Sequence, residues 1–203
     1  MNKKSSGKNS MARFMTNNVF TQEERELLKS IKNKKFLSFE FGDSFHGASR
    51  VNDKISFNFE DISFELHNSE ETVTYFGEDE EFSLLWLLKV DNTKPFISYC
   101  STDTIRKVDV NDVVTSIEIC EDIIKTVNQN NETDFDNVKL DKALIIRTKS
   151  NVYMFYTDWV CGEEIFFCNH DDYEECYPSR DLKESFGSET GYNVTLERKR
   201  VVL

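Results

Sequence analysis

The sequence predicts an α+β, mainly β fold, with an N-terminal helix followed by a largely antiparallel sheet that is barrel- or sandwich-like. Three observations predict it. Apolar and polar residues alternate with a period of two over several short segments, as half-buried strands require. One early segment has the residues of a helix cap in front of a helical apolar stripe. The chain of 203 residues contains 17 Phe, which is enough large side chains for the core of one domain.

The helix is predicted after a polar N-terminal segment. Thr21 and Glu24 have the spacing of a capping box, in which each side chain accepts a hydrogen bond from the other residue's backbone N–H. Leu27, Leu28 and Ile31 follow at helical spacing and give the helix one apolar face. The helix is expected to end near residues 32–35, because lysines there suit the negative end of the helix dipole.

The domain boundaries follow from composition. Residues 1–19 contain four Lys or Arg and no acid, and we expect a flexible basic tail there. Residues 20–203 are expected to form a single β-rich domain, because their number suits one hydrophobic core.

Alternation with a period of two begins after the helix. The apolar residues change parity at Glu60 and Asp61, which predicts a turn or bulge, because an unbroken strand would place one set in water. Lys149, Ser150 and Asn151 separate two alternating segments and predict a hairpin. The predicted strands cover residues 37–41, 55–59, 62–66, 72–76, 96–100, 144–148, 152–156, 165–168 and 192–202.

Two further segments are ambiguous. Residues 82–90 are nearly all apolar, so their periodicity does not separate a buried strand from a short helix. Residues 113–127 fit both a helical face and strand alternation. Their many β-branched side chains favour a strand.

The composition argues against membrane and secreted classes. No stretch approaches the roughly 18 consecutive apolar residues that a spanning helix needs, and the N-terminal lysines are not followed by the apolar region of a secretory signal. The chain has 5 Cys, an odd number, and is long enough to fold without disulfides, which indicates free thiols in a reducing compartment. We therefore expect a cytoplasmic protein of a bacterial or infected host cell.

The net charge of −12 is unevenly distributed along the chain. Residues 55–88 contain nine acids and no Lys or Arg, and residues 150–179 contain seven acids and no Lys or Arg. Soluble proteins ordinarily mix both signs over the surface. Segregated carboxylates create a field that attracts a basic partner and speeds its association. The same field repels nucleic acid, because proteins that bind it present basic patches.

The functional prediction is a non-catalytic acidic binding protein of the inhibitor or immunity type. It would block a basic protein effector, such as a nuclease, in phage–bacterial conflict, without a cofactor, direct nucleic-acid binding or a membrane. Interfaces favour aromatic anchors inside a polar rim. The predicted contact residues are Tyr75, Glu78, Asp79, Glu80, Glu81, Trp159, Asp171, Asp172, Tyr173, Glu174 and Glu175.

The second hypothesis is a metal-assisted hydrolase. Cys161, Cys168, His170 and Cys176 fall within sixteen residues, and thiolate and imidazole are ligands that zinc prefers. Their spacing lacks the close Cys-x2-Cys pairs of structural zinc sites, which favours free cysteines and no metal. The common nucleotide, hydrolase and zincin motifs are absent. A third hypothesis is a structural subunit of a larger complex.

Overall fold

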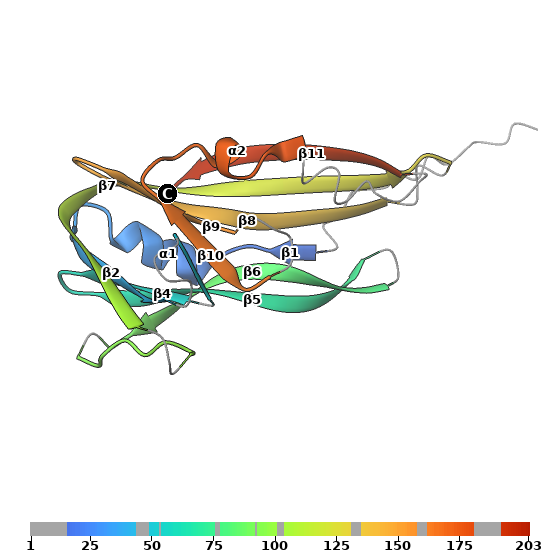
Figure 1. Ribbon diagram of the computed structural model, residues 1–203. Helices are drawn as coiled ribbons and strands as arrows, with labels where there is room; N and C mark the ends of the chain where they lie inside the picture. The colour runs from blue at the N-terminus through green and yellow to red at the C-terminus, as the bar shows by residue number, and fades with distance from the viewer. Residues whose placement is uncertain are drawn as a thin grey trace, which may run out of the picture.

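The structure, a computed structural model, describes residues 16–43, 49–52, 54–75, 78–91, 93–100, 104–130, 135–157, 162–180 and 192–203. Its elements in chain order are β1 (Thr16–Asn18), α1 (Gln22–Ser30), β2 (Lys35–Asp43), β3 (Arg50–Asn52), β4 (Lys54–Phe59), β5 (Ser63–Tyr75), β6 (Glu78–Val90), β7 (Thr104–Asn128), β8 (Phe135–Thr148), β9 (Val152–Tyr156), β10 (Glu164–Cys168), α2 (Tyr173–Cys176) and β11 (Tyr192–Val202) (Figure 1).

The described strands form one mostly antiparallel sheet. Its order is β3-β10-β9-β8-β7-β2-β4-β5-β6, with β11 paired to β7 and β1 paired in parallel to β8. The path starts at β3 and ends at β6, so the sheet is open. The mainly β prediction is confirmed.

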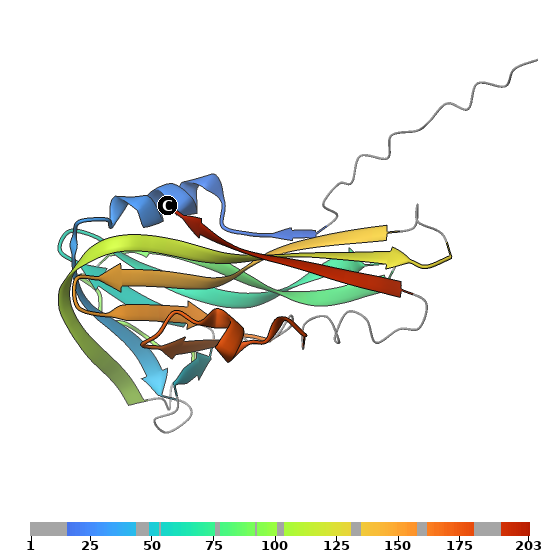
Figure 2. The ribbon, with the colours of Figure 1, turned by 90° about the horizontal axis from the view of Figure 1, so that it is seen from above.

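The long strand β7 divides this sheet into two layers. Residues 104–113 pair with β2, whereas residues 114–128 pair with β8 and β11. The register shifts between Val114 and Ser116, and a bulge of this kind bends a strand. Figure 2 shows β7 curving round one end of the molecule, and the side view in Figure 1 shows β2, β4, β5 and β6 in one layer and β8 and β11 in the other.

A phenylalanine-rich core fills the space between the layers. Phe57 of β4 is fully buried, and its ring centroid lies 4.7 Å from that of Phe155 on β9 in the opposite layer. Phe36, Phe39 and Phe64 surround it at centroid distances of 5.3 to 6.5 Å. A second apolar cluster lies on the other face of β8 and β9, where Tyr173 of α2 covers Ile145 and Met154.

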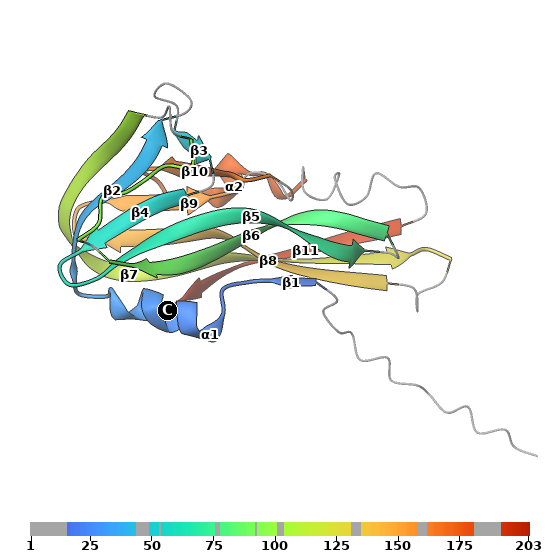
Figure 3. The same ribbon diagram turned by 90° about the horizontal axis from the view of Figure 1, so that it is seen from below.

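The helix α1 lies along one side of the two layers (Figures 2 and 3). Leu28 and Ile31 are fully buried in the core. Glu24 accepts a hydrogen bond from the backbone N–H of Leu87 on β6 at 2.6 Å, and Arg25 pairs with Asp141 on β8 at 2.7 Å. The helix therefore contacts both layers and covers part of the free edge of β6.

The capping box that the sequence predicts is present. Thr21 accepts from the N–H of Glu24, and Glu24 accepts from the N–H of Thr21. The helix ends at Ser30, slightly earlier than predicted, because Ile31 already leaves the helical pattern as its C-cap.

Replacing Thr21 with Ala should lower the free energy of unfolding by about 1 kcal/mol, because the first turn loses its side-chain acceptor. Urea denaturation followed by circular dichroism measures this. Thr21→Ser keeps the hydroxyl and should unfold near the wild-type midpoint. Equal midpoints for the Ala and Ser variants would contradict a role for the cap.

Several predictions need correction. β1 precedes α1 and pairs with β8, so the described chain begins with a strand, and residues 16–18 of the predicted tail lie in the sheet; residues 1–15 are outside the described residues. Residues 96–100 are irregular rather than a strand. Residues 82–90 belong to a strand, and the strand prediction for 113–127 is confirmed.

Candidate functional site

Six of the nine acids of the first cation-free segment lie towards the turn of the β5–β6 hairpin, whereas Asp61 and Glu65 pair with Lys34 and Lys54 elsewhere. Its register places Thr72 opposite Glu81, Val73 opposite Glu80, Thr74 opposite Asp79, and Tyr75 opposite Glu78. The side chains of residues 73–80 are outside the described part of the structure, so Tyr75, Glu78, Asp79 and Glu80 are placed by their backbone alone.

The described acids near this hairpin crowd one another. Glu70, Glu71 and Glu81 are exposed on β5 and β6, and Glu163, from the second cation-free segment, lies close enough to Glu70 to affect its titration. Desolvation, followed by the negative charges of Glu81 and Glu163, raises the pKa of Glu70. Among the described residues, no Lys or Arg forms an ion pair with these four acids. We call Glu70, Glu71, Glu81 and Glu163 the acidic hairpin patch.

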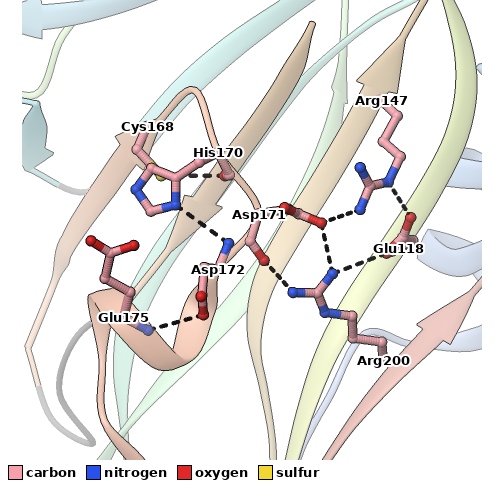
Figure 4. A network of polar contacts seen from close by, with 8 residues as sticks. All are labelled: Glu118, Arg147, Cys168, His170, Asp171, Asp172, Glu175 and Arg200. Atoms are coloured by element: carbon pink, nitrogen blue, oxygen red, sulfur yellow. Dashed lines mark hydrogen bonds and ion pairs between the residues drawn. The ribbon is translucent and has the colours of Figure 1, made fainter.

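The acids of the second segment lie elsewhere and are largely paired. Asp171 forms ion pairs with Arg147 of β8 and Arg200 of β11, and both arginines also contact Glu118 of β7 (Figure 4). Hydrogen bonds from Arg147 and Arg200 lower the pKa of Asp171. The charge of Asp171, a predicted contact residue, is therefore compensated, because the sheet brings two cations from distant positions of the sequence.

Arg198 of β11 compensates another predicted contact residue. It pairs with Glu174 at 2.5 Å and with both carboxylate oxygens of the fully buried Asp122 at 2.8 Å. It also donates to the carbonyl of Tyr177 at 2.8 Å, and its guanidinium lies 4.4 Å from the ring centroid of Tyr173. Arg198 therefore holds the short helix α2 against β7.

The structure corrects the prediction of Tyr173 as a surface anchor, and another predicted anchor, Trp159, lies outside the described residues. The Tyr173 side chain is 1% exposed, and its hydroxyl donates to the carbonyl of Thr157. A surface anchor needs an accessible ring, so Tyr173 is part of the core. Asp172 and Glu175 remain exposed, but Asp172 caps α2 by accepting from the Glu175 N–H at 3.1 Å.

Three of the four predicted metal ligands do come together. Cys168 ends β10, His170 lies in the following turn, and Cys176 ends α2. One ligand atom from each lies within 4.8 Å of the others. The Sγ of Cys176 is 3.8 Å from Nε2 of His170, and the Nδ1 of His170 accepts from the N–H of Asp172 at 3.3 Å. Burial raises the pKa of the Cys176 thiol to about 11. Cys161 lies outside the described residues.

A polar cluster that the sequence analysis missed lies on β5 and β6. His67 is buried, stacks on Trp86 with ring centroids 4.1 Å apart, and has Nε2 2.9 Å from Glu65. The hydroxyl of Tyr99 is 3.3 Å from its Nδ1. Lys54 contacts Glu65 at 3.3 Å and lies over the Tyr99 ring. The cluster therefore brings an imidazole, a carboxylate, a phenol and an ammonium group into contact.

This cluster adjoins a groove of about 800 Å³. The groove lies between the polar faces of β2, β4 and β5 and the irregular segment 93–100, and Lys54 and Glu65 belong to its lining. Ile97 and Tyr99 of the same segment are 71% and 61% exposed. The side chain of His67 is buried because Tyr99 and Trp86 cover it.

Within the described residues, no helix has the length and apolar character to span a bilayer. Comparisons with protein-family models, curated proteins and solved structures found no match to this chain.

Proposed function

We propose that this protein is a non-catalytic binding protein that captures a basic protein partner through its acidic hairpin patch. The partner class is an effector that handles nucleic acid, such as a nuclease, and the activity is inhibition by occupying the effector's phosphate-binding surface. The observation that carries the proposal is that the acids of this patch are exposed and that, among the described residues, no Lys or Arg forms an ion pair with them. Desolvation, and then the nearby charges of Glu81 and Glu163, raise the pKa of Glu70.

Unpaired carboxylates at one place make a local negative potential. Such a potential accelerates the association of a cationic partner by about 10- to 1,000-fold, and added salt screens it. Glu78, Asp79 and Glu80 lie on the same hairpin and add further negative charge to it. Asp171 and Glu174 contribute less, because arginines already compensate them.

The test neutralises the patch with Glu70→Gln, Glu71→Gln, Glu81→Gln and Glu163→Gln in one variant. The wild-type protein, used as bait in a native lysate at low salt, should retain a basic protein that high salt releases. Once that protein is purified, its association rate constant with the variant should fall on the order of tenfold or more. In complex with the wild-type protein, the captured protein should also lose its affinity for DNA.

The matched control removes the same number of exposed carboxylates away from the hairpin, through Glu26→Gln, Glu60→Gln, Asp109→Asn and Glu197→Gln. It should retain the partner with nearly wild-type kinetics. If both variants bound the partner equally weakly, the effect would come from net charge alone and not from the patch. Unchanged binding of the patch variant would refute the proposed surface.

A further inference from the structure

The segment 168–176 brings three zinc-type ligands to one place. β10 ends at Cys168, the chain turns through His170, and α2 returns to place Cys176 beside the imidazole. We propose that Cys168, His170 and Cys176 bind one divalent zinc ion, with the fourth position open to water.

The spacing of the ligand atoms fits zinc. Zinc binds thiolate sulfur at about 2.3 Å and imidazole nitrogen at about 2.0 Å in tetrahedral geometry, so a sulfur and a nitrogen on one ion lie about 3.5 Å apart. The Sγ of Cys176 and the Nε2 of His170 are 3.8 Å apart, and the set with Cys168 stays within 4.8 Å. Small side-chain rotations bring all three to bonding distance.

The ligands are held by structure that does not depend on the ion. Cys168 pairs with Met154 in the β9–β10 ladder. Asp172 caps α2, and Arg198 fixes the far end of α2 through the Tyr177 carbonyl and Glu174. Supporting contacts of this kind orient metal ligands and raise affinity. The geometry is therefore largely formed before the ion binds.

Zinc binding at these three residues is a ligand exchange. Zinc replaces the two thiol protons, which pass to solvent water, and neutral His170 keeps its single proton by moving it to Nδ1 when Nε2 binds. That move removes the hydrogen bond from the Asp172 N–H to Nδ1. His170 is exposed, so water can reach the ion. An exchangeable fourth position is also what zinc hydrolases use to activate water, so the same centre would serve the hydrolase alternative.

The experiment uses the full chain, prepared without a polyhistidine tag and under reducing conditions. Elemental analysis should find about one zinc per chain, as expected for a single three-ligand site. Titration of the zinc-free protein with cobalt(II) should produce a sulfur-to-cobalt charge-transfer band that saturates at about one equivalent, because cobalt occupies tetrahedral thiolate sites of this type.

Cys176→Ser and His170→Ala should weaken cobalt binding by more than about 100-fold, since loss of even a supporting outer residue costs about 10- to 100-fold. The matched control is Cys100→Ser, which removes an exposed cysteine outside the cluster and should bind cobalt like the wild type. Circular dichroism of each variant separates loss of ligand from loss of fold.

One result would overturn the proposal: a wild-type protein, folded and reduced, that shows no charge-transfer band with cobalt at any concentration tested. The wild-type titration decides the question even if every ligand variant fails to fold.

Discussion

Arg198→Ala should lower the free energy of unfolding by about 3–5 kcal/mol, the usual loss when one partner of a buried ion pair is removed. Asp122 is fully buried and would keep its charge without the two 2.8 Å hydrogen bonds from the guanidinium. The ring of Tyr173 would also lose its cation contact. Urea denaturation monitored by tryptophan fluorescence measures the change.

Lys199→Ala is the matched control for this variant. Lys199 neighbours Arg198 on β11 and pairs with Glu197 on the exposed surface, so its loss should change stability by less than about 1 kcal/mol. The double variant Asp122→Leu with Arg198→Met should recover most of the loss, because no buried charge remains unpaired. If Arg198→Ala unfolded at the control's midpoint, the pair would not hold α2 to the sheet.

Phe57→Ala should lower the free energy of unfolding by about 3–5 kcal/mol, the range for truncating a buried Phe. Phe57 is fully buried, and the rings of Phe36, Phe39, Phe64 and Phe155 surround it. The variant would leave a cavity at the contact between the layers. The midpoint of urea denaturation and its slope give the free energy.

Ile97→Ala serves as the control, because Ile97 is 71% exposed in an irregular segment and surface changes usually stay within about 0.5 kcal/mol. Phe57→Leu should fall between the two, since it keeps most of the buried volume. A loss below about 1 kcal/mol for Phe57→Ala would show that the two layers do not depend on this contact.

The order of strands along the chain was largely predictable, because alternation is a local property. The strand at 113–127 followed from its β-branched residues, and the turn at Glu60 and Asp61 followed from the change of parity. The strand β1 was not predictable, since three polar residues carry no periodic signal and gain their structure only by pairing with β8. The bend of β7 was likewise not visible in the sequence.

The candidate sites show the same division. The sequence identified the cation-free segments and the Cys168, His170 and Cys176 set, because both are visible as local composition. It did not identify the burial of His67, which depends on Tyr99 being brought back over β5 from 32 residues away.

The sequence by itself determined a β-rich chain with one capped helix, a phenylalanine core and two acidic stretches without Lys or Arg. Tertiary structure alone decided which of those acids stay uncompensated. The antiparallel register of β11 on β7 places Arg198 opposite Asp122 and Arg200 opposite Cys120, within reach of Glu174 and Asp171. Charge is neutralised across space, and pairing between residues more than twenty positions apart is set by strand register rather than by neighbouring sequence.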